Sequence, residues 1–194
     1  MRKIIFILIT LIIIAAFTGV IFAQRSTVHQ LRADIESLKR DILVLAFERQ
    51  ILTTNRQLKP AVSLQIAVAI LECADLYELD PRLLFATMKQ ESHFNQQAIG
   101  STGERGLMQI AKNTAGDIGL PWQEAFDITA NTCAGAAYLA RHVHERGVLA
   151  GLLRYNGGGE LRYPQYVLAH YPAMLERSNN GVVLSLLKTK APRL

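Results

Sequence analysis

The most apolar stretch of the chain lies at its N-terminus. Residues 4–23 are apolar except for two threonines and one glycine, and Arg2 and Lys3 precede them. As a helix this stretch spans about 30 Å, one bilayer core. The apolar core of a cleaved signal peptide is only about 7 to 15 residues long, so the length favours a retained membrane anchor, with cleavage after Ala23 as the alternative. Since the basic residues stay in the cytoplasm, we expect a single pass with the rest of the chain exported.

A second periodic stretch follows the first. Its apolar residues recur at spacings of three and four, at Val28, Leu31, Ile35, Leu38, Ile42 and Leu45. This is the heptad pattern of a coiled coil, although it lasts under three heptads. The pattern predicts a helical, possibly coiled-coil spacer over 24–59. The apolar face of 28–45 has two possible roles. It would mediate self-association or bind a partner helix, or it would pack as a single helix against the membrane or the C-terminal part of the chain.

From Pro60 onward the apolar positions have helical periodicity. Asp80-Pro81 is typical of an N-cap and a first helical residue, and Gly147 suits a helix C-terminus. Sustained strand alternation is absent from the sequence. The pattern predicts helices at 61–78, 81–92, 106–116, 131–146, 148–155, 163–170 and 172–177.

The predicted fold class is therefore all-α. About 170 residues remain after the anchor, enough for one domain with attachments. The predicted segments are a signal anchor or transmembrane helix at 1–23, the spacer at 24–59, a helical domain at 60–177 and a C-terminal tail at 178–194.

The formal net charge of +5 is unevenly distributed. Residues 24–59 carry seven bases against four acids, whereas residues 60–177 carry nine bases against twelve acids. Basic residues thus flank the predicted domain, which suits contacts near a membrane better than binding of nucleic acid. The sequence also lacks interleaved aromatic and basic residues, so we expect no nucleic-acid partner.

One carboxylate on an apolar helix face is a candidate catalytic group. Leu84, Met88 and Glu91 share one face of the predicted 81–92 helix. A carboxyl group in apolar surroundings without a cationic partner is disfavoured in its charged form, so its pKa should rise into the range of a general acid. Taken alone, the position favours a helix-end glutamate turned toward solvent, and only the surrounding sequence changes that interpretation.

Four ordered blocks provide that context. They are Glu91 to Asn95, Gly106 to Ile110 with Thr114-Ala115, Asn131 to Leu139, and Tyr155 to Gly158. Over roughly residues 60–177 they resemble the soluble lytic transglycosylase (SLT) family. The chain departs from many relatives at Lys112, where they have proline, a difference that concerns helix entry.

The resemblance implies a goose-lysozyme-like helical domain acting on the glycan strands of peptidoglycan. The reaction it implies is cleavage of the β-1,4 bond between N-acetylmuramic acid and N-acetylglucosamine, with formation of 1,6-anhydromuramyl ends. With the predicted anchor at 4–23, such an enzyme would lie in the inner (cytoplasmic) membrane, with its catalytic domain facing the periplasm or cell wall.

The resemblance also assigns roles to side chains. Glu91 would be the catalytic acid and later the base, assisted by the N-acetyl group of the substrate. The residues expected to bind the glycan are Ser92, Met108, Gln109, Tyr138, Tyr155 and Asn156. Without the resemblance, Met108 and Tyr138 would be assigned to the core.

Most glycosidases use a second carboxylate, for which Glu104 and Asp117 are candidates. Glu104 lies in a Gly-rich loop and Asp117 follows a helix end, so the sequence favours surface or capping roles for both. Alternative functions are a muramidase that uses water as nucleophile, or an inactive wall-binding scaffold of a secretion, conjugation or phage machine. The histidines have no metal-ligand spacing, and we expect neither metal nor cofactor.

Cys73 and Cys133 are the two cysteines of the chain. Export would permit a disulfide between them. Both lie in Ala-rich helical stretches, where a reduced cysteine is commonly a small core residue, so the sequence favours two free thiols over a bridge.

Overall fold

The computed structural model describes the backbone of residues 2–176 and the side chains of residues 17–171. Its elements are α1 (Arg2–Thr54), α2 (Pro60–Leu76), α3 (Pro81–Ser92), α4 (Lys112–Asp117), the 3-10 helix η1 (Trp122–Glu124), α5 (Ile128–Arg146), α6 (Val148–Tyr155) and α7 (Tyr163–Glu176). Among the described residues there is no β-strand, only isolated bridges that pair Arg105 with Ile99 and Ile110. The all-α prediction is confirmed for this part of the chain. The predicted tail at 178–194 lies outside it.

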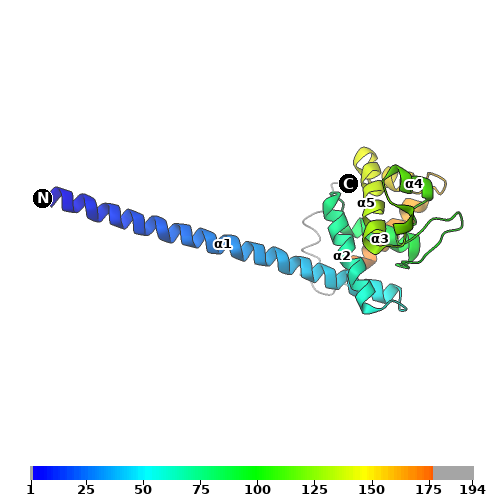
Figure 1. The fold of residues 1–194 in the computed structure, drawn as a ribbon, viewed down its shortest axis with the longest axis horizontal. Helices are drawn as coiled ribbons and strands as arrows, with labels where there is room; N and C mark the ends of the chain where they lie inside the picture. The colour runs from blue at the N-terminus through cyan, green and yellow to red at the C-terminus, as the bar shows by residue number, and fades with distance from the viewer. Residues whose placement is uncertain (1, 177–194) are drawn as a thin grey trace. The chain divides into compact units, whose positions relative to one another are not determined.

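The chain divides into two compact units, Met1–Asp41 and Ile42–Leu194. The first unit is the N-terminal part of α1, drawn in blue in Figure 1. Its heptad residues Val28, Leu31, Ile35 and Leu38 are all exposed. Residues 4–16 of the predicted membrane span lie outside the residues whose side chains the structure describes. Among the described residues, no helix is long and apolar enough to cross a membrane.

The second unit begins earlier than the sequence predicts. Its core was expected to start near Pro60, yet Phe47 and Ile51, on the last turns of α1, are buried. The Phe47 ring stacks on Phe85 of α3 with centroids 5.2 Å apart, and Phe85 contacts Phe94 at 4.7 Å. Phe47 and Ile51 are four residues apart and share a helix face. Because they follow the heptad residues, the sequence places them in the predicted spacer. The end of α1 is therefore part of the domain.

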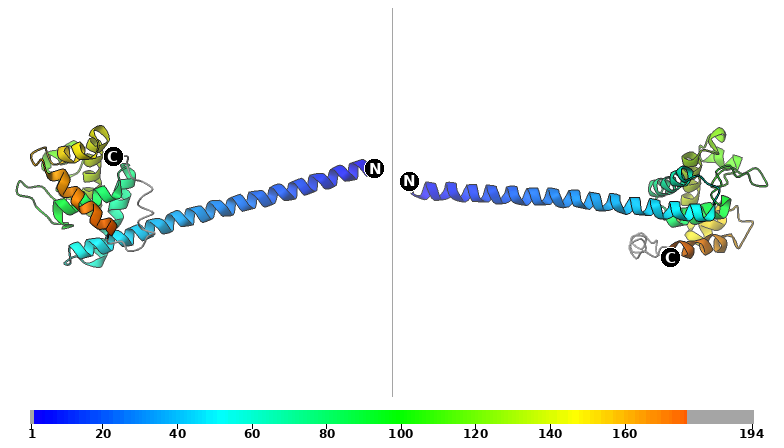
Figure 2. Two further views of the ribbon diagram at one scale, coloured as in Figure 1. Left: turned by 180° about the vertical axis from the view of Figure 1, so that it is seen from behind. Right: turned by 90° about the horizontal axis from the view of Figure 1, so that it is seen from below.

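α5 packs against both α2 and α6, while α7, orange in the left view of Figure 2, packs against α3 and α6. A disulfide between Cys73 and Cys133 joins α2 to α5, with Cα atoms 4.9 Å apart. The prediction of two free thiols is thus wrong. Small residues such as Ala69 and Ala136 are buried on these helices and let their backbones approach closely enough for the bridge.

The predicted helix 106–116 is also wrong in its first half. Residues 106–110 form a tight turn in which Arg105 and Ile110 exchange two backbone hydrogen bonds of 3.0 Å, and α4 begins only at Lys112. The φ angles of Gly106 and Gln109 are +77° and +46°, which an α-helix does not contain. The apolar spacing of this block fits a helix, but its backbone takes other hydrogen-bond partners.

The side chain of Asn131 supplies those partners. It is fully buried at the start of α5; its Oδ1 accepts from the Met108 N–H at 2.8 Å, and its Nδ2 donates to the carbonyls of Arg105 and Ala125. A Cβ at Gly106 would overlap the Ala125 carbonyl oxygen, so the turn requires glycine there. Asn131 therefore fixes the shape of the turn.

The C-terminal helix differs from the sequence prediction as well. Two helices at 163–170 and 172–177 were predicted with a break before Pro172, whereas α7 runs through this position as one helix. A proline inside a helix removes one backbone hydrogen bond, and the packing of α7 on α3 and α6 outweighs that loss.

Candidate active site

A cleft of about 380 Å³ lies between the end of α3, the 100–111 loop, α5 and the end of α6. Its lining residues are Glu91, Gly100, Ser101, Glu104, Gln109, Ile110, Ala111, Thr114, Tyr138, Tyr155, Asn156 and Gly157. The structure thus brings together five residues that the sequence predicts for the site, Glu91, Gln109, Tyr138, Tyr155 and Asn156.

Glu91 lies in the last turn of α3 and is mostly buried. Burial raises the pKa of its carboxyl to about 7; the hydrogen bond from Tyr163 lowers this pKa, and the charge of Glu104 raises it. The rise agrees with the prediction from the apolar helix face. A carboxyl group with this pKa remains partly protonated at neutral pH, as a general acid requires.

Tyr163 is not among the residues that the sequence predicts for the site. It is the first residue of α7, its ring is buried, and its hydroxyl donates a hydrogen bond to Glu91 Oε1. Burial and then the charge of Glu91 raise the pKa of the Tyr163 phenol far above its ordinary value, so the hydroxyl keeps its proton. The two residues are 72 positions apart, and no local pattern in the sequence connects them.

Tyr155, at the end of α6, holds the 106–110 turn from the cleft side. Its hydroxyl donates to the Met108 carbonyl at 2.7 Å, and burial, followed by the charge of Glu91, raises its pKa well above the ordinary value. Its ring lies 5.5 Å from that of Tyr138. Asn156 caps α6 through its backbone N–H and lines the cleft. The two tyrosines and Asn156 form one continuous wall.

The 100–111 loop adds polar side chains to the lining, among them Gln109 and Glu104. Gln109 Nε2 donates to the carbonyls of Ala98 and Gly106, at 3.2 and 2.9 Å. Glu104 accepts from the hydroxyl and the N–H of Thr102, and these hydrogen bonds lower the pKa of its carboxyl. Glu104 therefore lines the cleft as an ionised and partly exposed group.

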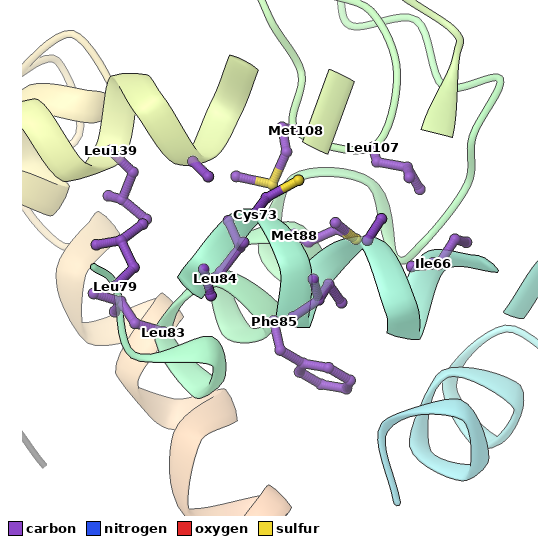
Figure 3. Packing of buried hydrophobic residues seen from close by; sticks show 14 of the residues in the cluster. Ile66, Cys73, Leu79, Leu83, Leu84, Phe85, Met88, Leu107, Met108 and Leu139 are labelled. Atoms are coloured by element: carbon purple, nitrogen blue, oxygen red, sulfur yellow. The ribbon is translucent and has the colours of Figure 1, made fainter. Parts of the chain in front are cut away.

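Two predicted glycan-binding residues do not line this cleft. The Met108 side chain is fully buried, close to Gly135 of α5, and Figure 3 shows it among core side chains such as Leu84 and Met88. Ser92 donates its hydroxyl to the Met88 carbonyl at 3.3 Å and lines a separate depression near the end of α1.

The other candidate carboxylate, Asp117, is exposed on α4 and does not line the cleft. Within the residues that the structure describes, no group of three His, Cys, Asp or Glu side chains is arranged to hold a metal ion.

Comparison with known proteins connects this cleft to one family. Residues 68–163 match the family model described as the Transglycosylase SLT domain, a range that includes Glu91 and ends at Tyr163. The chain is 32% identical over 133 residues to membrane-bound lytic murein transglycosylase F of Desulfosudis oleivorans, covering 64% of this chain and 27% of the relative. It is 39% identical over 83 residues to a transglycosylase of Enterobacteria phage PRD1, covering 42% and 31%.

Among solved structures, an inactive mutant of the lytic transglycosylase Slt from Pseudomonas aeruginosa aligns with 77% of this chain and 31% of its own, at 23% identity and a TM-score of 0.46. The chain spans less than a third of the length of the two curated relatives named above.

Proposed function

The chain belongs to the transglycosylase SLT domain family through residues 68–163, and we propose that it is a lytic transglycosylase of peptidoglycan. The observation that carries this proposal is the buried carboxyl of Glu91, which has a pKa of about 7, lies in an open cleft and accepts a hydrogen bond from Tyr163. The helical domain around it would be lysozyme-like, as the family resemblance implies.

The reaction follows from one carboxyl group used twice. Protonated Glu91 donates its proton to the glycosidic oxygen, and the C1–O bond to the leaving sugar breaks as positive charge develops at C1. The N-acetyl group of the substrate stabilises this centre. The C6 hydroxyl of the muramyl sugar then forms a bond to C1, and its proton passes to the Glu91 carboxylate, which restores the acid and leaves a 1,6-anhydro ring.

The remaining cleft residues would bind the glycan. Gln109 offers an amide, Asn156 a second amide, and Tyr138 and Tyr155 provide ring surface beside the acid. Met108 would contribute through its backbone, because its carbonyl fixes the Tyr155 hydroxyl. Ser92 would act on the geometry of the helix end that carries Glu91.

We further propose that residues 4–23 anchor the protein in the inner membrane with the domain in the periplasm. The apolar run behind two basic residues supports this, as does the Cys73–Cys133 disulfide, since such bonds persist in oxidising compartments. The exposed heptad residues of 28–45 would serve self-association or a partner helix. Recovery of full-length protein in membranes after carbonate extraction tests the anchor, and soluble protein beginning at Gln24 would contradict it.

Digestion of purified sacculi by the full-length chain in detergent, followed by mass analysis of the fragments, tests the activity. Anhydromuramyl ends that disappear in Glu91→Gln support a lytic transglycosylase. Reducing ends would identify a muramidase that uses water as nucleophile. The ionised Glu104 in the cleft favours this alternative, because it offers a second carboxylate. Binding without cleavage would leave a wall-binding scaffold.

A further inference from the structure

The carboxylate of Glu104 is held in place within the 100–111 loop. Thr102 donates to it twice, from its hydroxyl to Oε1 and from its N–H to Oε2 at 3.3 Å, and the Glu104 carbonyl accepts from the Gly100 N–H at 2.8 Å. A Cβ at Gly100 would overlap Glu104 Oε2 and would stand 2.8 Å from Gln109 Oε1. The carboxylate therefore lies over Gly100 beside Gln109, rather than extending freely into solvent.

This fixed carboxylate faces the same cleft as the acid. Tyr163 and Tyr155, on the helices packed around Glu91, are kept neutral because burial raises their pKa values. Among the described side chains that line the cleft with Glu91, Glu104 is the one that carries a charge at neutral pH. Its negative charge raises the pKa of Glu91.

We propose that Glu104 is a positioning residue, a fixed anion on the loop wall of the cleft that holds the proton on Glu91 until the glycan is bound. The proposal rests on the proposed function, in which Glu91 must be protonated to begin the reaction. The same charge makes the Glu91 carboxylate a stronger base when it later takes the proton of the attacking hydroxyl. Glu104 acts through Glu91 and forms no bond to the sugar.

The direct test is the titration of Glu91 in the full-length chain without substrate. Infrared difference spectra follow the C=O stretch of a protonated carboxylic acid, and the band that Glu91→Gln abolishes belongs to Glu91. Glu104→Gln keeps the shape of the side chain and removes its charge, so the titration midpoint of Glu91 should fall by about half a pH unit, as expected for a partly screened neighbour.

Two controls separate charge from structure. Glu104→Asp retains the anion and should restore most of the wild-type midpoint. Asp117→Asn removes an exposed carboxylate that does not line the cleft, and should leave the midpoint where it is. An unchanged midpoint in Glu104→Gln, or an equal shift in Asp117→Asn, would overturn the proposal.

Sacculus cleavage provides the second readout. Because only protonated Glu91 starts the reaction, the ratio of wild-type to Glu104→Gln rates should grow about threefold from pH 5 to pH 8, the equivalent of half a pH unit. A loss of about 100-fold or more at every pH would instead make Glu104 a base or nucleophile of a hydrolytic pair and refute the positioning role. If the wild-type chain cleaves no glycan but the infrared midpoint still shifts, the proposed function fails while the effect of Glu104 on Glu91 stands.

Discussion

Replacing Glu91 by glutamine should stabilise the protein at alkaline pH while abolishing its activity. The pKa of Glu91 is raised from an ordinary 4.5 to about 7 by burial, so the folded state binds this proton more tightly than the unfolded chain does. The resulting stabilisation is complete below about pH 4.5. It declines as the pH rises and is lost once the pH passes the folded-state pKa near 7. At about 1.4 kcal/mol per pKa unit, the difference between pH 4 and pH 8 is at most about 3 kcal/mol.

Glutamine resembles the protonated carboxyl group and carries no charge to desolvate. Glu91→Gln should therefore match the wild-type free energy of unfolding at pH 4 and exceed it by up to about 3 kcal/mol at pH 8. Urea unfolding of both proteins across this range, followed by circular dichroism, measures the difference. Sacculus cleavage should fall by at least about 10²- to 10⁴-fold.

Asp117→Asn, on exposed α4, is the matched control and should show no such trend with pH. A stability difference between Glu91→Gln and wild type that stays the same from pH 4 to pH 8 would mean that Glu91 titrates normally. In that case the general-acid assignment loses its physical basis.

Three further predictions follow from the contacts around the site and the core. Tyr163→Phe removes the hydrogen bond that lowers the pKa of Glu91, so the alkaline limb of the cleavage profile should move to higher pH; a move to lower pH would contradict this. Reducing the Cys73–Cys133 bridge should lower the free energy of unfolding by about 4 kcal/mol, because the bridge closes a loop with a sequence separation of 60. Urea titrations with and without dithiothreitol measure this difference, and equal midpoints would show that the bridge contributes nothing. Phe47→Ala should cost about 3 to 5 kcal/mol by thermal or urea unfolding, a loss that a spacer residue outside the core would not produce.

Helical periodicity, together with capping residues, predicts much of the fold. The bounds of α3 and α6 agree with those read from the sequence, because an Asp-Pro N-cap and a glycine at position 147 mark them chemically. The prediction of a helix at 106–110 is wrong because the side chain of Asn131, which lies at least 21 residues further along the chain, takes hydrogen bonds that periodicity cannot represent. Long-range packing likewise draws the end of α1 into the core.

The candidate site divides in the same way. The apolar helix face makes Glu91 a candidate, but the family blocks favour a catalytic role for it, and the same blocks predict Gln109, Tyr155 and Asn156 for the site. Tyr163 cannot be found in this way, because it reaches Glu91 through a contact across 72 residues of sequence. Glu104 is a candidate carboxylate in the sequence, but only the structure places it in the cleft with Glu91. Met108 lies in a family block, yet its side chain is buried in the core. Membership of a block therefore does not distinguish a residue that contacts the glycan from one that packs in the core beneath the site.

The disulfide divides the site into residues inside a covalently closed loop and residues that follow this loop in the chain. Glu91, Glu104 and Gln109 all lie between Cys73 and Cys133, whereas Tyr155 and Tyr163 follow the second cysteine. When the domain opens locally, the disulfide keeps the acid and the cleft loop near each other, but α7 can separate from α3 without breaking a covalent bond. Such an opening would take the phenol away from Glu91 and admit water to its carboxyl. A protease that cuts before α7 would therefore leave the acid on a disulfide-closed fragment that lacks its hydrogen-bond donor.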